Sequence, residues 1–218
     1  MKKVTLIAAL ITSAFSVCTN AATTSATLNI TGKVIPGSCT ISTGGSGGSI
    51  DFGTIKTSEL TTPTVNKRGK ASLSVDCQTD TTAFFKVSGA NGFNAENNQF
   101  ATDKDFATYA VGLNNITVTG GNAAGNIIIP ADKETVLTLE TISSTQFQQA
   151  GNGKSVVFPL NGTYFAPKAS DSLSVGTFRN VNADVIVSAR IDSEKAKAAV
   201  QSGEQVFGSV FTFELNYI

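Results

Sequence analysis

The chain has no His and no Trp among its 218 residues, and it contains a single Met. Without His it can form no Ser-His-Asp or Cys-His nucleophile pair and no His-ligated metal site. Charge is also scarce: Asp, Glu, Lys and Arg make up 15% of the residues, and 16 basic residues balance 16 acidic ones. Without a basic excess there is no electrostatic attraction to nucleic acid. We therefore expect no enzyme activity, no cofactor, no metal and no nucleic-acid partner.

Long apolar runs are missing too, apart from one near the start of the chain. Lys2 and Lys3 precede an apolar stretch of 14 residues over positions 4–17, and small residues follow up to Ala21. This is the pattern of a secretory signal peptide that is cut after Ala21, so we assign residues 1–21 to it. The stretch is shorter than the ~20 residues that a membrane-spanning helix needs. We expect an exported mature chain without a membrane span.

Removal of the signal peptide changes the cysteine count from three to two. Cys18 is lost with it, and Cys39 and Cys77 remain. Two cysteines in an exported chain predict one disulfide, and their separation of 38 residues does not fit a C-x-x-C redox or metal motif. Closing a loop of that size is worth roughly 4 kcal/mol in the chain-entropy account of disulfides.

Alternating apolar and polar residues are what the mature chain has in abundance. The runs are short and are bounded by Gly, Asn, Ser or Asp, which is typical of many short strands in an all-β sandwich or barrel. One helix is predicted over residues 192–202, with Asp192 or Ser193 as its N-cap and Gly203 as its end. We find no linker and expect one domain. The predicted strands lie at 26–30, 72–75, 109–113, 136–142, 156–165, 181–191 and 206–218.

Charged clusters offer little chemistry. Asp103 and Asp105 could share a cation through their carboxylates, but two acids in a polar stretch are more often a solvated loop. The basic group Lys67, Arg68 and Lys70 is interpreted in the same way, as a solvated turn before a strand.

The order of several short motifs resembles the pilins, which are the subunits of chaperone–usher fimbriae in Gram-negative bacteria. The resemblance runs through LNITGKVIPGSC at 28–39, IDFGTI at 50–55, LSVDC at 73–77 and YAVGL at 109–113, and continues over 157–166. Tyr217 falls at the penultimate position, where such subunits usually place an aromatic residue.

The resemblance implies an immunoglobulin-like sandwich over residues 33–218 that lacks its final strand, preceded by a donor strand at 22–32. It implies that a periplasmic chaperone fills the resulting groove first. At an outer-membrane usher the donor strand of the next subunit then replaces the chaperone, which gives a head-to-tail fimbria on the cell surface. The donor residues implied are Thr24, Ala26, Leu28 and Ile30, with Gly32 at the close approach, and the last strand, with which the chaperone pairs, carries Phe211, Phe213, Leu215 and Tyr217.

Two departures from the pilin pattern leave alternatives open. Ala26 stands where pilin donor strands often have Gly, and there are two candidate final strands, at 182–191 and 206–218. The second could border the groove, or it could complete the sandwich and abolish the groove. The alternatives to a structural subunit are a fimbrial tip adhesin or secreted carbohydrate-binding sandwich, and a self-complete periplasmic β-sandwich.

Overall fold

The computed structural model describes residues 38–44, 48–94, 97–132, 134–158 and 161–218. They belong to one compact unit, Pro36–Ile218. The predicted signal peptide and the predicted donor strand at 22–32 lie outside the described residues, and so do Thr24, Ala26, Leu28, Ile30 and Gly32. Within the described part, the helices are all too short or too polar to cross a membrane.

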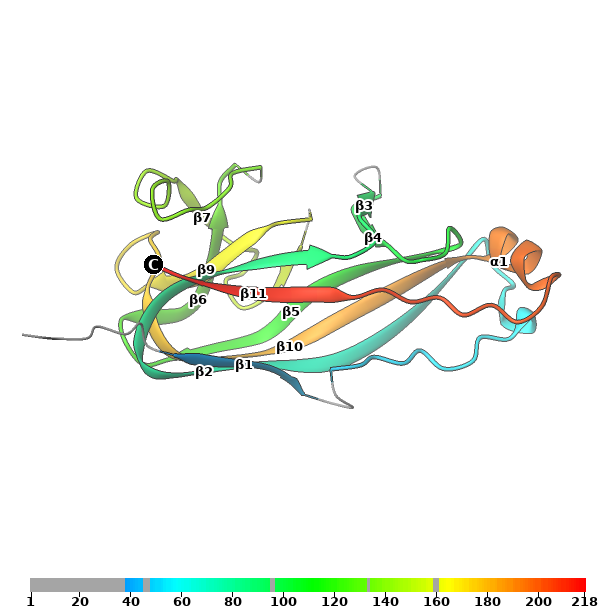
Figure 1. Cartoon of the computed structure of the whole chain (residues 1–218), viewed down its shortest axis with the longest axis horizontal. Coiled ribbons are helices and arrows are strands. Elements are labelled where there is room, and N and C mark those ends of the chain that lie inside the picture. Colours follow the sequence, from blue (N-terminus) through cyan, green and yellow to red (C-terminus); the bar gives the residue numbers. More distant parts are fainter. Residues whose placement is uncertain (1–37, 45–47, 95–96, 133, 159–160) are drawn as a thin grey trace, which may run out of the picture. The chain divides into compact units, whose positions relative to one another are not determined.

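Antiparallel strands dominate the described residues (Figure 1), which confirms the predicted all-β sandwich. The elements in chain order are β1 (Cys39–Gly44), η1 (Thr57–Glu59), β2 (Thr64–Gly89), β3 (Phe93–Asn94), β4 (Gln99–Ala101), β5 (Ala107–Thr119), β6 (Ala123–Pro130), β7 (Phe147–Gln149), β8 (Val156–Val157), β9 (Tyr164–Ala169), β10 (Thr177–Asp192), α1 (Ser193–Val200) and β11 (Phe211–Tyr217).

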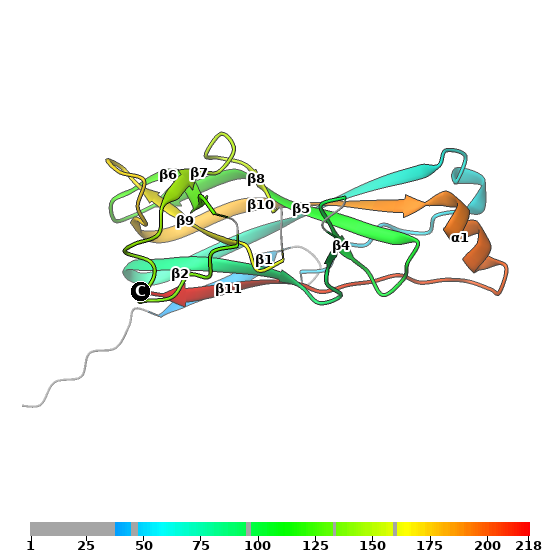
Figure 2. The ribbon, with the colours of Figure 1, turned by 90° about the horizontal axis from the view of Figure 1, so that it is seen from above.

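Strand β2 is 26 residues long and belongs to both layers of the sandwich. Its first part lies between β1 on one side and β10 on the other, and β10 pairs in turn with β5. Its last part lies between β11 and β9, and β9 pairs with β6. Figures 1 and 2 show the curve by which β2 passes from one layer to the other.

The main core lies between these two layers. Leu73 and Val75 on β2 are buried, whereas Ser72 is exposed and Ser74 is half-buried, as the period-2 pattern predicts. The other layer contributes Phe85 and Phe165, whose rings stack with centroids 4.7 Å apart. A second, smaller cluster at the α1 end contains Leu60, Phe106, Ala107, Ala189, Ile191 and Ala196.

Several predicted elements are confirmed in place. The strands at 72–75, 109–113 and 181–191 lie within β2, β5 and β10. The helix α1 begins at Ser193, and the Asp192 side chain accepts a hydrogen bond from the Lys195 N–H at 3.0 Å. Asp192 is therefore the N-cap, which satisfies one of the free N–H groups of the first turn.

Three strand predictions were wrong in whole or in part. Residues 136–138 belong to no strand and residues 139–142 form turns, because the Thr138 and Thr141 hydroxyl groups bond to nearby backbone and to each other. The run at 156–165 is divided into β8 and the start of β9 by a turn in which Gly162 has a φ of 80°. Residues 206–210 are extended but belong to no strand, so β11 starts only at Phe211.

Candidate functional site

Strand β11 is an edge strand: among the described residues it pairs only with β2. The Val210 C=O accepts from the Ala90 N–H at 2.9 Å, and the Ile218 N–H donates to the Thr82 C=O at 3.0 Å. In an antiparallel ladder, every second residue of a strand bonds to the same neighbour. The backbone N–H and C=O groups of the even-numbered residues from 210 to 218 therefore point toward β2. The backbone groups of the odd-numbered positions, 211 to 217, therefore point away from β2 toward the open edge.

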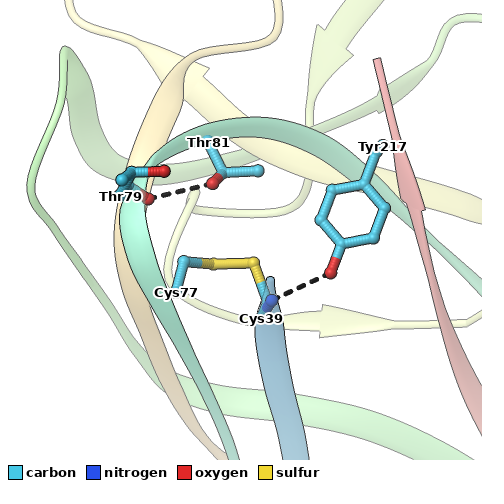
Figure 3. Close-up of a disulfide and its surroundings, with 5 residues drawn as sticks. All are labelled: Cys39, Cys77, Thr79, Thr81 and Tyr217. Carbon is cyan, nitrogen blue, oxygen red and sulfur yellow. Dashed lines mark hydrogen bonds between the residues drawn. A yellow bond between two sulfur atoms is a disulfide. The ribbon is translucent and has the colours of Figure 1, made fainter. Parts of the chain in front are cut away.

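The side chains at those odd positions face the core but remain partly open. Phe211, Phe213 and Leu215 pack against the main core and are only half-buried, although they are large and apolar. Tyr217 is 37% exposed, and its hydroxyl accepts a hydrogen bond from the Cys39 N–H at 2.9 Å (Figure 3). Cys39 is in turn joined to Cys77 by a disulfide, which links β1 to β2.

A groove of about 490 Å³ runs beside the start of β11. One wall is formed by residues 48–52 and the other by residues 207–213. The floor comes from the opposite layer and is mainly apolar, with Val185 and Val187 from β10 and Val111 from β5. A second hollow of about 560 Å³ shares Ile50, Phe52 and Phe207 with the first and continues to α1. The two hollows are therefore adjacent and share these three residues as lining.

Both walls consist partly of extended chain outside any strand. Residues 49–55 follow β1 and, within the described part of the chain, make no backbone–backbone hydrogen bond. On the opposite wall, residues 204–210 lead into β11 and belong to no strand. An extended segment beside an apolar groove, with backbone groups that pair with no strand in the described part of the chain, is a template for strand addition.

One part of the groove is polar. The Tyr109 hydroxyl lies 3.0 Å from the Ser209 hydroxyl, which donates to the Asn91 side-chain oxygen at 3.0 Å. Burial raises the pKa of Tyr109, and the hydrogen bond with Ser209 acts in the opposite direction. The phenol therefore stays neutral at physiological pH and serves as a hydrogen-bonding group within an otherwise apolar lining.

The four residues predicted for the last strand all lie on β11, but only two of them line the groove. Phe211 and Phe213 line the groove, whereas Leu215 and Tyr217 continue the same edge beyond it. The floor residues Val185 and Val187 escaped the sequence analysis as site residues, since a valine in a central strand carries no sign that a groove opens above it. For the opposite wall, the sequence did contain an indication, because the alternating apolar residues Ile50 and Phe52 are typical of an extended segment with one apolar face.

Comparison with known proteins gives a sparse result. A family model described as "Protein of unknown function (DUF1120)" matches residues 28–127. No curated protein matches the chain. Among solved structures, the chain is similar to the P pilus rod subunit PapA, with 18% sequence identity, coverage of 88% of this chain and 99% of that one, and a TM-score of 0.39.

It is also similar to the CupB6 tip adhesin from Pseudomonas aeruginosa, with 12% identity, coverage of 71% of this chain and 34% of that one, and a TM-score of 0.32. The chain thus spans about a third of the length of that adhesin. Both TM-scores lie below 0.5. The function proposed below therefore rests on the groove and on the open edge of β11.

Proposed function

We propose that the chain is a structural subunit of an adhesive fimbria, assembled through the chaperone–usher pathway by donor-strand exchange. The observation that carries the proposal is the apolar groove of about 490 Å³ beside the start of β11, a strand whose outer edge pairs with no other strand among the described residues. Both sheet layers contribute to its lining. The groove has the two features that an added strand requires, a row of free backbone groups and a channel for alternate side chains.

A subunit with an empty groove is prone to aggregate in water. Half-buried Phe211 and Phe213 expose apolar surface, and the edge beside them invites uncontrolled pairing with other strands. A strand inserted along β11 would remove both liabilities at once, because it would pair the backbone and cover the apolar side chains.

The inserted strand that fits is residues 22–32 of a second copy. Thr24, Ala26, Leu28 and Ile30 share one parity, so all four would point to the same face of an extended strand. Gly32 would allow the donor backbone to approach the acceptor core closely. Because the donor and the groove are different surfaces of one chain, the contact is head-to-tail and does not close, which produces a filament.

This function sets the remaining partners and the location. A periplasmic chaperone would occupy the groove after export, and an outer-membrane usher would exchange the chaperone for the next subunit. The finished fimbria lies on the cell surface. The role depends on backbone pairing and apolar burial, so it needs no catalytic residue, no metal and no cofactor.

Peptide binding tests this proposal. The acceptor is the mature chain with Leu28→Asp and Ile30→Asp, which disables its own donor face. A fluorescent peptide of residues 22–32 should bind, since its four alternate side chains would enter the groove and its backbone groups would pair with the open edge of β11. Fluorescence anisotropy measures the dissociation constant.

Two further peptides act as matched controls. A peptide with Leu28→Asp and Ile30→Asp should lose binding, because both charges would enter the apolar groove. A peptide with Thr27→Asp and Asn29→Asp carries the same charges on the opposite face and should bind like the natural sequence. Equal affinity of all three peptides, or no binding by any of them, would contradict the proposal.

A further inference from the structure

We infer that Asp103 is a positioning residue that extends the strand-accepting edge beyond the start of β11 as far as Phe207. The inference rests on the proposed function, because it concerns the same groove. It assigns a structural role to one of the two acids that the sequence analysis considered as cation ligands.

Asp103 pairs with both backbone groups of Gly208. The Gly208 N–H donates to the Asp103 Oδ1 at 2.6 Å, and the Asp103 N–H donates to the Gly208 C=O at 3.0 Å. Strand β2 ends at Gly89, opposite Phe211, so it offers Gly208 no partner. Asp103 makes the two bonds that a neighbouring strand would otherwise make.

These bonds continue the alternation of β11 through residues 207–209, so that their backbone groups point in the same two directions as those of the strand. Gly208 has the even parity of the positions that face β2, and Val210 between it and β11 bonds to Ala90. Phe207 and Ser209 therefore direct their backbone groups toward the open edge, as the odd residues of β11 do. Within the described residues, the backbone groups of Phe207 and Ser209 make no backbone–backbone hydrogen bond. The edge that can accept a strand thus includes two residues, Phe207 and Ser209, in addition to the odd-numbered residues of β11.

The loop that carries Asp103 is itself held in place. The Thr102 hydroxyl lies 2.8 Å from both the Lys104 and the Ala107 carbonyl oxygens, which fixes the turn between β4 and β5. On the wall, the Ser209 side chain bonds to Asn91 and Tyr109. The wall is therefore attached at two adjacent residues, Gly208 and Ser209.

This attachment fixes the backbone of a wall whose Phe207 side chain is already packed. Phe207 lines both hollows, and its ring lies 6.4 Å from that of Phe52 and 6.0 Å from that of Phe106, within the second core cluster. Asp103 adds the backbone hydrogen bonds that this side-chain packing does not supply. With Asp103 in place, the wall stays extended and ready to pair with an incoming strand.

Amide hydrogen exchange tests the inference on the mature chain with Leu28→Asp and Ile30→Asp, with the peptide of residues 22–32 as the probe. With Asp103 intact, the peptide should slow exchange at Phe207 and Ser209 as well as at Phe213 and Leu215. Asp103→Ala should remove the protection at Phe207 and Ser209 and retain it at Phe213 and Leu215. The same substitution should raise the peptide dissociation rate about tenfold or more, as expected for the loss of two backbone hydrogen bonds to the peptide.

Three variants separate this role from general stability. Asp103→Asn keeps the Oδ1 acceptor and should behave like the unchanged acceptor, whereas Gly208→Pro removes the donor and should behave like Asp103→Ala. Nothing lies within 4 Å of a Cβ at Gly208, but the proline ring also closes on the nitrogen, so its Cδ takes the place of the N–H and displaces the Asp103 Oδ1, which lies 2.6 Å from that nitrogen. Asp105→Ala removes a nearby exposed acid and should change nothing.

The failure of this inference differs from the failure of the proposed function. If Asp103→Ala and Gly208→Pro leave the protection of Phe207 and Ser209 unchanged, Asp103 does not extend the edge, although the peptide still binds. If the peptide protects no residue of the acceptor with Asp103 intact, the proposed function itself is wrong.

Discussion

Single residues hold the open edge at both of its ends. At the end of β11, the Tyr217 hydroxyl accepts from the Cys39 N–H, and the disulfide ties Cys39 to Cys77 on β2 (Figure 3). At the start of β11, Asp103 holds Gly208. Neither contact could be found in the sequence, because the partners are separated by 178 and 105 residues. The cysteine pair could be predicted, since removal of the predicted signal peptide would leave only Cys39 and Cys77.

The disulfide should stabilise the fold strongly. Replacing both partners, Cys39→Ser with Cys77→Ser, should lower the free energy of unfolding by up to about 4 kcal/mol, because the unfolded chain regains the entropy of a 38-residue loop. Urea denaturation of the unreduced protein and of the double variant measures the difference. An unchanged unfolding midpoint would contradict a stabilising role.

At the scale of elements, alternation located the central strands but not their neighbours. Residues 72–75, 109–113 and 181–191 bury one parity, so periodicity was sufficient to predict these parts of β2, β5 and β10. It did not give the full strands, because the buried parity changes along them, as at Ile116 and Val118 in β5. The same pattern over residues 136–142 was misleading, because Thr hydroxyls there satisfy the local backbone in turns. At 206–210 alternation is present without a strand, since β2 has already ended at Gly89.

The two backbone edges of β11 should respond differently to substitution by proline. The Glu214 N–H faces β2, so Glu214→Pro should break the ladder and lower the unfolding midpoint markedly. The Leu215 N–H faces the open edge, so Leu215→Pro should be nearly as stable as Leu215→Ala. Leu215→Pro should nevertheless bind the peptide of residues 22–32 several-fold more weakly than Leu215→Ala, because one backbone donor is lost.

Thermal unfolding and fluorescence anisotropy on the three variants provide these measurements. Equal peptide affinity of Leu215→Pro and Leu215→Ala would mean that the peptide does not pair along this edge. Equal stability of Leu215→Pro and Glu214→Pro would mean that the alternation deduced for β11 is wrong.

At the scale of the whole molecule, the groove is made from segments that are distant in the sequence. Phe52 on one wall, Val187 on the floor and Phe211 on the other wall come from three separate segments of the chain. In the sequence, each of them looks like an ordinary core residue. Which strand edge is left unpaired depends on the topology of both layers. The groove therefore became visible only in the folded chain, although the alternating segment at 22–32 already indicated a strand without an obvious place.

The most direct test of the account is the assembly state of the mature chain, measured by analytical ultracentrifugation over a range of concentrations. The natural sequence should form a ladder of head-to-tail oligomers that lengthens with time. The variant with Leu28→Asp and Ile30→Asp should stay monomeric, and the variant with Thr27→Asp and Asn29→Asp should still assemble. A natural chain that remains monomeric at every concentration, or a Leu28→Asp and Ile30→Asp variant that assembles as well as it does, would contradict donor-strand exchange through this groove.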